Sequence, residues 1–333
     1  MNKVTVLYQS DDSYAAYMGV SIYSLFENNK EANQINVYII NDSISQENTE
    51  KLLDMAEKYR RRICFLDPKE LLNDTAISMT FRCIGKRWNN HSYLKLLFAR
   101  MISEKVDRLL YIDCDTIIAD SVVPLFNMDM GGCPIGMVQD SLITDSKQSI
   151  GIKNTDRYYN SGVILIDTEK WKVSSCEERI LYHLGNVRVY GTIDQDVLNV
   201  VFKSEILTLP VRYNLQPIFL DYSLKQYNRV YKHAEPYYSG AEIQDALLHP
   251  AIYHFLRYLG QSPWHKDSMH PCKTIFDYYL DRSPWKELEK KEGRNGLAFK
   301  LERMLYKALP KGAFLTLFNI YHEHMIRNGN TEK

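Results

Sequence analysis

The first half of the chain alternates between short apolar runs and longer segments in which apolar residues recur at helical spacing. In residues 13–28, for example, Tyr14, Met18, Ile22 and Leu25 fall on one helical face. This alternation predicts an α/β fold, with a mostly parallel sheet covered by helices on both faces. The runs that predict strands lie at 4–8, 35–40, 62–67, 107–113, 134–140, 161–167, 205–210 and 251–255. The segments that predict helices lie at 13–28, 45–59, 92–102 and 192–203.

The alternation of predicted strands and helices ends near residue 280. We therefore expect a domain over residues 1–280 and a helical, basic and aromatic tail over 281–333. Within 294–311 an apolar stripe repeats at helical spacing, which indicates either a helix packed on the domain or a basic amphipathic helix lying on an anionic membrane. A second apolar cluster beyond Pro310 favours the membrane. The stripe comprises Leu297, Leu301, Met304 or Leu305, and Ala308, and the basic residues expected to meet lipid are Lys300, Arg303, Lys307 and Lys311.

Composition narrows the class of protein. The 333 residues suffice for one large domain with an appendage or for two domains. A formal net charge of zero argues against a general nucleic-acid binder. The six cysteines are scattered, which predicts buried thiols in a reducing compartment. No apolar run approaches the roughly 20 residues that span a bilayer, and "MNKVTVLYQSDD" lacks the apolar region of a signal peptide. We expect a cytoplasmic protein, peripheral on the inner face of the cell membrane if its tail binds lipid.

The apolar run at 107–112 ends in two carboxylates, Asp113 and Asp115, separated by Cys114. In extended backbone, residues i and i+2 point to the same side, so the two acids should project together while Cys114 faces away. Ligands of open α/β sheets bind beyond the carboxyl ends of strands, where this pair lies. Paired carboxylates repel unless a cation such as Mg²⁺ or Mn²⁺ neutralises them. The alternative is turn chemistry, because Asp favours strand exits.

Polar residues also flank two later strands. Asn160, Ser161 and Gly162 stand at the start of an apolar strand, where a glycine permits close approach of the backbone to a ligand. His254 lies in or just after the last predicted strand. By itself such a histidine is either a hydrogen-bonded core residue or a ligand.

The stretch "GTIDQDVLNVVF" has the composition of a helix start. Thr192 and Gln195 match a T-x-x-Q capping box, which would explain Gln195 without catalysis. Asp194 and Asp196 repeat the D-x-D spacing, but acids in a first turn are also favoured by the helix dipole. The D-x-D pattern alone is therefore weak evidence for a metal.

Six segments in this order resemble family 8 of the retaining glycosyltransferases, the group that contains bacterial lipopolysaccharide galactosyl- and glucosyltransferases and eukaryotic glycogenin. The resemblance covers about residues 3–266, and six modest motifs in register make it specific. The segments are "VLYQSDDSYAAYMGVSIYSLFEN", "DRLLYIDCDTII", "YYNSGVILIDTEKW", "TIDQDVLNVVF", "LPVRYNLQP" and "IYHFLRYLGQSPW".

The resemblance implies a GT-A fold, a Rossmann-like nucleotide-binding mixed sheet flanked by helices. It also implies a UDP-hexose donor (glucose or galactose), a glycan or glycolipid acceptor, and Mn²⁺, or Mg²⁺, held by Asp113, Asp115 and His254. The residues it places on the donor nucleotide or its metal are Tyr8, Asp11, Ser13, Tyr14, Lys95, Asp113, Cys114, Asp115, Gly260 and Lys266. Those it places around the transferred sugar are Asp140, Asn160, Ser161, Asp194 and Gln195.

Two departures from the family pattern bear on the diphosphate. Relatives read H-F-x-G-x-x-K-P-W, with the lysine on the diphosphate, whereas "HFLRYLGQSPW" is two residues longer and carries Ser262 before Pro263. Arg257 or Lys266 could supply the missing charge. Upstream, relatives carry an arginine whose nearest equivalent here is Lys95, with one extra residue in the spacing. A lysine offers a point charge in place of a bidentate fork.

The resemblance places Gln195 nearest the face from which a covalent nucleophile would attack, and a neutral amide is a poor nucleophile. This favours attack from the face of the departing diphosphate, with Asp194 binding sugar hydroxyls. Two other classes of protein remain open: a metal-dependent UDP-sugar hydrolase or pyrophosphatase, and a catalytically decayed sugar-binding protein. The sequence does not distinguish glucose from galactose, and we expect acceptor contacts from 75–92.

Overall fold

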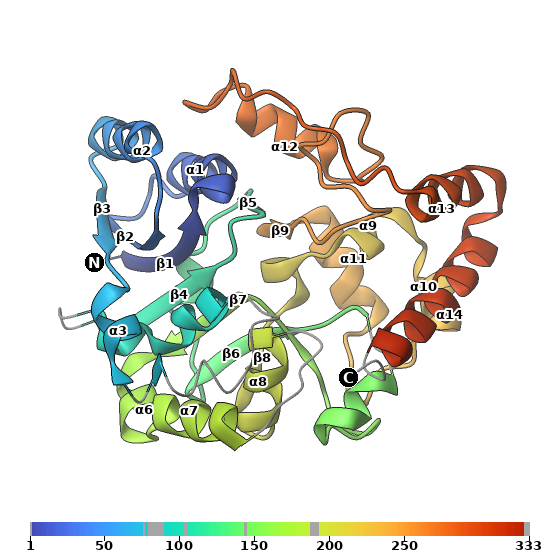
Figure 1. The fold of residues 1–333 in the computed structure, drawn as a ribbon, viewed down its shortest axis with the longest axis horizontal. Helices are drawn as coiled ribbons and strands as arrows, with labels where there is room; N and C mark the ends of the chain where they lie inside the picture. Colours follow the sequence, from blue (N-terminus) through green and yellow to red (C-terminus); the bar gives the residue numbers. More distant parts are fainter. Residues whose placement is uncertain are drawn as a thin grey trace.

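The computed structural model describes residues 2–75, 77–78, 90–102, 106–142, 145–186 and 193–329. Its centre is a seven-stranded mixed sheet of order β3-β2-β1-β4-β7-β6-β8, and β5 and β9 form a separate two-stranded sheet (Figure 1). Four of the six pairings in the large sheet are parallel, and β7 is antiparallel to both of its neighbours. The strands are β1 Lys3–Asp11, β2 Gln34–Asp42, β3 Arg62–Leu66, β4 Arg108–Ile112, β5 Thr116–Ile118, β6 Ile135–Gln139, β7 Tyr159–Asp167, β8 Ile206–Thr208 and β9 Ile252–His254.

Helices cover both faces of this sheet, so the expected mixed α/β architecture is confirmed. The helices of the first half are α1 Asp12–Glu27, α2 Gln46–Lys58, α3 Lys69–Asn73, η1 Asn90–Arg100, α5 Val123–Phe126, η2 Asp145–Ile150, α6 Thr168–Val173 and α7 Cys176–Asn186. Those of the second half are α8 Ile193–Val201, η3 Val211–Asn214, α9 Pro217–Asp221, α10 Leu224–Val230, α11 Gly240–Leu248, α12 Lys273–Leu280, α13 Leu297–Ala308 and α14 Lys311–Gly329.

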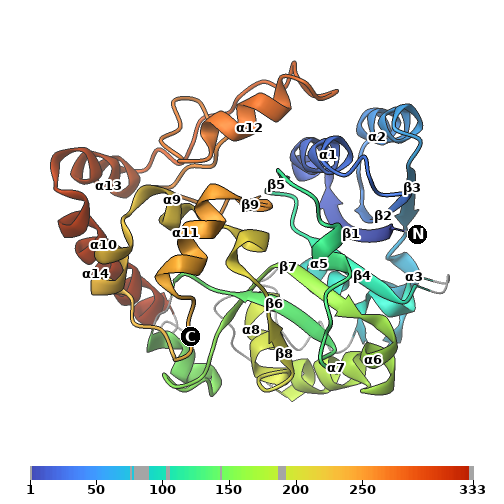
Figure 2. The ribbon, with the colours of Figure 1, turned by 180° about the vertical axis from the view of Figure 1, so that it is seen from behind.

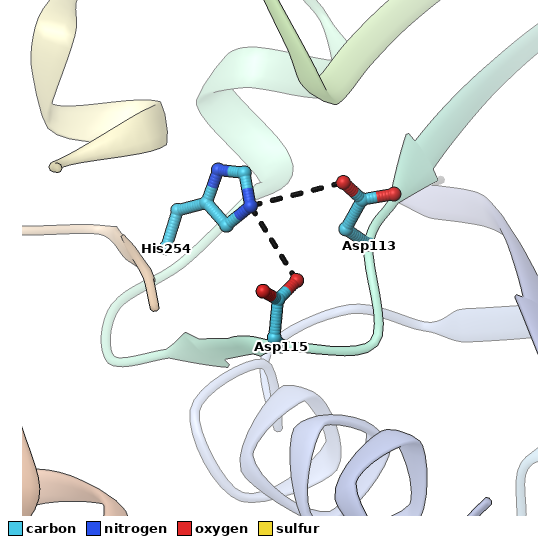
Figure 3. A group of neighbouring side chains, drawn as sticks. All are labelled: Asp113, Asp115 and His254. Carbon is cyan, nitrogen blue, oxygen red and sulfur yellow. Dashed lines mark ion pairs between the residues drawn. The ribbon is translucent and has the colours of Figure 1, made fainter. Parts of the chain in front are cut away.

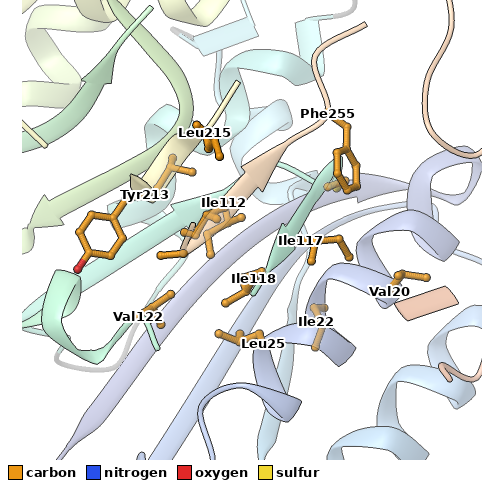
Figure 4. Close-up of a cluster of buried hydrophobic side chains, with 14 of the residues drawn as sticks. Val20, Ile22, Leu25, Ile112, Ile117, Ile118, Val122, Tyr213, Leu215 and Phe255 are labelled. Atoms are coloured by element: carbon orange, nitrogen blue, oxygen red, sulfur yellow. The ribbon is translucent and has the colours of Figure 1, made fainter. Parts of the chain in front are cut away.

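The side chains of β1 alternate between two buried clusters. Val6 and Tyr8 join the cluster that α1 covers, whereas Leu7 joins the cluster with η1 and α8. A period of two is what a strand buried on both faces requires. In the first cluster, residues of α1 such as Ile22 and Leu25 lie against β5 (Figure 4).

One predicted helix has a different geometry. Residues 92–102 were expected to form an ordinary helix, but η1 is a 3₁₀ helix with a kink at Leu97. Two of its backbone N–H groups, those of Lys95 and Ala99, donate to the side chains of Gln9 and Glu177, which lie outside the helix. These contacts replace part of the regular α pattern.

Of the two alternatives for α13, contact with the domain is observed, but the apolar stripe does not take part in it. None of the residues of α13, all of which the structure describes, is buried, and Leu297 is 87% exposed. The opposite face, carrying Phe299, Arg303 and Tyr306, contacts the domain, because its aromatic and guanidinium groups find partners on the segment after β9.

The second tail helix, α14, docks through buried Phe314 and Leu315 beside α10. In both views α10, α13 and α14 lie at one end of the molecule and α2 and α3 at the other (Figures 1 and 2). Trp285, just beyond residue 280, packs beneath Gly19 of α1. Of the helices described, none combines the length and apolarity that crossing a bilayer demands.

Candidate active site

Asp113, Asp115 and His254 converge at the carboxyl end of β4. The two acids lie in the loop between β4 and β5, and β9 pairs with β5 so that Thr116 stands opposite His254. The His254 Nε2 atom lies 3.4 Å from Asp115 Oδ1 and 3.7 Å from Asp113 Oδ2 (Figure 3). One ligand atom from each residue can be chosen so that all three lie within 4.8 Å of one another. His254, 139 positions after Asp115 in the sequence, therefore joins the predicted pair of carboxylates.

The partners of the Asp113 carboxylate are the side chains of Tyr111, Lys95 and His254. The Tyr111 hydroxyl donates to Asp113 Oδ1 at 2.5 Å, and the Lys95 ammonium lies 3.4 Å from the same oxygen. Hydrogen bonds within a turn therefore do not alone account for the position of the Asp113 carboxylate. Cys114 turns away as predicted, and its thiol donates to the carbonyl of Gln9 at 3.0 Å.

The electrostatics of this group favour charged partners. Burial alone would lower the pKa of His254, but Asp115 and Asp113 outweigh burial and raise it. Burial raises the pKa of Asp115, and His254 outweighs that effect and lowers it. The two carboxylates thus favour the charged form of the His254 ring.

Gly162 and Asn214 hold the His254 ring in place. A Cβ atom on Gly162 would lie 2.1 Å from His254 Cε1, so only glycine leaves room for the ring. The group that approaches this glycine is therefore a side chain of the protein, and not a ligand as expected. Asn214 Nδ2 donates to Asn160, which leaves Asn214 Oδ1 to accept from His254 Nδ1 at 2.9 Å. The Nε2 atom then faces the carboxylates.

A buried chain of amides leads from the histidine to the predicted sugar pocket. Asn160 Nδ2 and the Ser161 N–H donate to Gln195 Oε1, and Gln195 Nε2 donates to Asp140 Oδ2 at 2.7 Å. The Gln195 side chain thus links β7 to Asp140, a role that the capping-box interpretation did not include. Its proposed capping partner, Thr192, lies outside the described residues, as does most of the stretch 75–92.

Lys95 links the two predicted groups of residues. Its ammonium lies 2.7 Å from Asp194 Oδ2, and the Ser161 hydroxyl donates to the same oxygen. Burial lowers the pKa of Lys95, but Asp113 and Asp194 outweigh burial and raise it, so the lysine stays charged. Asp196 accepts instead from Tyr158 and Lys147. On a helix residues i and i+2 diverge, so the second D-x-D does not form a pair.

The residues expected to meet the nucleotide occupy different environments. The Tyr8 side chain is buried, and its hydroxyl lies 3.0 Å from Ser21 Oγ, so its ring offers no exposed surface to a nucleotide. Asp11 caps α1 by accepting from the Tyr14 N–H and the Ser13 hydroxyl. Tyr14 is 40% exposed.

The remaining predicted nucleotide contacts follow β9. Gly260 has a φ of +70° and lies under the ring of Phe299. The Lys266 side chain is exposed, and its N–H donates to the carbonyl of Lys291. The structure brings Lys95, Asp113, Asp115, Asp194 and His254 into direct contact.

Two residues of this network were missed from sequence. Asn214 lies in the quoted segment "LPVRYNLQP", and Tyr111 lies within the apolar run before the acids. In the sequence, Asn214 and Gln216 simply alternate with apolar residues. An asparagine in such a stretch is also typical of a turn.

The model of the glycosyl transferase family 8 matches residues 5–268. A lipopolysaccharide 1,2-glucosyltransferase of Escherichia coli (strain K12) is 28% identical over 281 residues, which is 80% of each protein. Among solved structures, the galactosyltransferase LgtC in complex with donor and acceptor sugar analogs has a TM-score of 0.63 at 23% identity, over 84% of this chain and 96% of LgtC. The bifunctional glycosyltransferase WbbM has a TM-score of 0.69 at 17% identity, over 86% of this chain, which spans half of WbbM. These structures share the GT-A fold, and the family match covers most of the sequence: the chain belongs to glycosyltransferase family 8.

Proposed function

We propose that this glycosyltransferase moves a hexose, glucose or galactose, from a UDP-sugar to a glycan or glycolipid acceptor and forms an α-linkage with retention. The observation that carries the proposal is the convergence of Asp113, Asp115 and His254 at the carboxyl end of the sheet in a family 8 chain. A role in the synthesis of lipopolysaccharide or another surface polysaccharide is supported by the relatives named above.

The donor set of the three residues fits a divalent ion. Two carboxylates with one imidazole suit Mn²⁺, with Mg²⁺ as the harder alternative. Asn214 orients the histidine through its other ring nitrogen, as partners of metal-bound histidines do. An ion bound there supplies positive charge where the departing diphosphate accumulates negative charge.

The remaining residues bind and orient the sugar. Gln195 has both ends of its amide engaged, by Asn160 and Asp140, so it presents a fixed neutral group beside the anomeric carbon. Asp194 is paired with Lys95, and this pairing reduces its nucleophilicity. Both features support attack from the same face, in which a diphosphate oxygen takes the proton of the acceptor hydroxyl. A glycosyl adduct on Asp194, trapped and detected by mass spectrometry, would contradict this mechanism.

The same contacts argue against a decayed enzyme. The candidate metal ligands, their orienting amide and the sugar-side network are all satisfied by one another, although Ser262 replaces the expected lysine. Incubation with UDP-glucose or UDP-galactose and Mn²⁺ tests the reaction. Transfer or slow donor hydrolysis releases UDP, whereas a pyrophosphatase releases UMP and sugar phosphate. Absence of any turnover would contradict the proposal.

We further propose that the tail beyond residue 280 contacts an anionic membrane from the cytoplasmic side. Support comes from the exposed apolar residues of α13 and α14, such as Leu301 and Ile320, next to the exposed Lys300 and Lys307. The other two predicted lipid contacts have internal partners: Arg303 donates to Leu259 and Lys311 to Asp221. Of the five cysteines that the structure describes, Cys114, Cys176 and Cys272 are buried thiols as predicted, whereas Cys64 and Cys133 are only partly buried.

A further inference from the structure

Three aromatic rings pack together in α10 and in the segment that follows it: Tyr227, His233 and Tyr237. The rings of His233 and Tyr237 are stacked, with their centroids 3.7 Å apart and their planes 10° from parallel. The Tyr227 ring is fully buried, and its centroid lies 5.7 Å from that of His233. Close packing of this kind keeps the Tyr227 hydroxyl in one position.

The Tyr227 hydroxyl has three partners, and their chemistry decides which of them receives its proton. The carbonyl oxygen of Ser141, at 2.7 Å, can only accept, so Tyr227 donates to it. The Tyr227 oxygen then accepts from His233 Nε2 at 2.5 Å and from the Tyr237 hydroxyl at 3.2 Å. Burial lowers the pKa of His233 to about 4, so its ring is neutral and carries its one proton on Nε2. Burial also raises the pKa of Tyr227, so its hydroxyl keeps the proton that it donates.

Ser141 is held on its other side by the buried side chain of Gln216. The Ser141 N–H donates to Gln216 Oε1 at 3.0 Å, and the Ser141 hydroxyl donates to the same oxygen. Gln216 follows Asn214 by two residues, and Leu215 between them is extended, so both amides point to the same side. One short segment therefore holds His254 through Asn214 and Ser141 through Gln216.

The peptide unit between Ser141 and Leu142 connects Tyr227 to Asp140. Its carbonyl oxygen accepts from the Tyr227 hydroxyl, and its N–H donates to Asp140 Oδ1 at 3.0 Å. The other carboxylate oxygen of Asp140 accepts from Gln195 Nε2 at 2.7 Å. A chain of three hydrogen bonds thus runs from Tyr227 through one peptide unit and one carboxylate to the amide of Gln195.

We propose that Tyr227 is a positioning residue for sugar transfer, because it holds the Ser141–Leu142 peptide unit that fixes Asp140 against Gln195. This inference rests on the proposed use of a UDP-sugar. A peptide unit is planar, so its C=O and N–H groups turn together. Gln216 holds the preceding peptide unit, so loss of the Tyr227 hydroxyl frees the Ser141–Leu142 unit alone to rotate and to release the Asp140 carboxylate. The chain does not pass through the three candidate metal ligands, so the binding of UDP itself should not depend on it.

Tyr227→Phe tests the assignment, because it removes one oxygen atom and leaves the ring. Donor hydrolysis is measured with UDP-glucose and UDP-galactose in the presence of Mn²⁺, and the Kd for UDP is measured by calorimetry. The kcat/KM for the better donor should fall about tenfold or more, because misplacing a positioning group by about 1 Å can cost about 100-fold in rate. The Kd for UDP should stay at the wild-type value. The control Tyr59→Phe removes a hydroxyl that donates to Glu27 at the end of α2, and it should leave both quantities unchanged. Unchanged kcat/KM in Tyr227→Phe, or an equal loss of UDP affinity, overturns the proposal.

A double-mutant cycle tests whether Tyr227 acts through Asp140. Tyr227→Phe should have no further effect on kcat/KM in the Asp140→Asn background, and an equal loss in both backgrounds would overturn the positioning role. If Tyr227→Phe does not fold, Tyr237→Phe takes its place, because it removes a donor to the Tyr227 oxygen. That variant should lower kcat/KM at unchanged UDP affinity, and an unchanged kcat/KM would overturn the proposal. If the wild-type protein turns over neither UDP-sugar, the proposed function fails; if it does and Tyr227→Phe matches it, only this inference fails.

Discussion

Gly162→Ala tests how the histidine is seated. The added Cβ atom would lie 2.1 Å from His254 Cε1 and 2.5 Å from Nδ1. Carbon atoms in contact normally lie about 3.5–4.0 Å apart, so the ring must retreat by more than about 1 Å. Overpacking of this kind typically costs about 1–3 kcal/mol of stability. Metal ligands tolerate displacements of only about 0.2 Å, so Mn²⁺ affinity should fall at least about tenfold.

The assay pairs thermal unfolding with Mn²⁺ calorimetry, and Gly185→Ala provides the matched control. A Cβ atom on Gly185, in α7, meets nothing within 4 Å. That variant should keep wild-type metal affinity and be equally or more stable, because alanine favours a helix over glycine. If Gly162→Ala bound Mn²⁺ as tightly as the wild type, His254 could not be a ligand in the position described.

Three further predictions follow from the site and the tail. Asn214→Ala should lower the free energy of unfolding by about 1–3 kcal/mol and Mn²⁺ affinity about 10- to 100-fold, since it frees the His254 ring; unchanged affinity in calorimetry would refute the orienting role. The carboxylates raise the pKa of His254 above its ordinary 6.5, so protons compete with Mn²⁺ for the ring nitrogen. Mn²⁺ affinity should therefore decline as the pH falls through that raised pKa. An Mn²⁺ affinity that stays constant from about pH 8 to 6 would speak against His254 as a ligand. The double variant Lys300→Ala/Lys307→Ala should bind phosphatidylserine vesicles about thirtyfold more weakly in sedimentation, because each lysine contributes about 1 kcal/mol. The control Lys172→Ala, on α6 at a distance from α13 (Figure 1), should sediment like the wild type. Equal binding by all three proteins would exclude α13 as the lipid contact.

Sequence patterns predicted the architecture because its strands are either continuous apolar runs or short segments bounded by polar turns. Asp113 and Asp115 were identifiable from their spacing at a strand end, since backbone geometry alone places them on one side. His254 and Gln195 were ambiguous in isolation. Both became informative only when the resemblance placed them in register with the other motifs.

The rest depended on contacts between distant parts of the chain. The sequence left open whether the stripe of α13 packs on the domain or lies on a membrane. Arg303 and Tyr306 find partners on the segment after β9 and on Asp221, and those contacts turn the stripe away from the domain. Asn214 carries no local signal for its role. It acquires that role from His254, 40 residues later, because the neighbouring Leu215 pairs with Tyr253 of β9.

The most direct test is anomalous diffraction from crystals soaked with Mn²⁺ and UDP. The account predicts one manganese peak in contact with Asp113, Asp115 and the Nε2 atom of His254, with the diphosphate of the nucleotide touching the ion. A nucleotide bound elsewhere, or a bound nucleotide with no manganese peak among these three side chains, would contradict it.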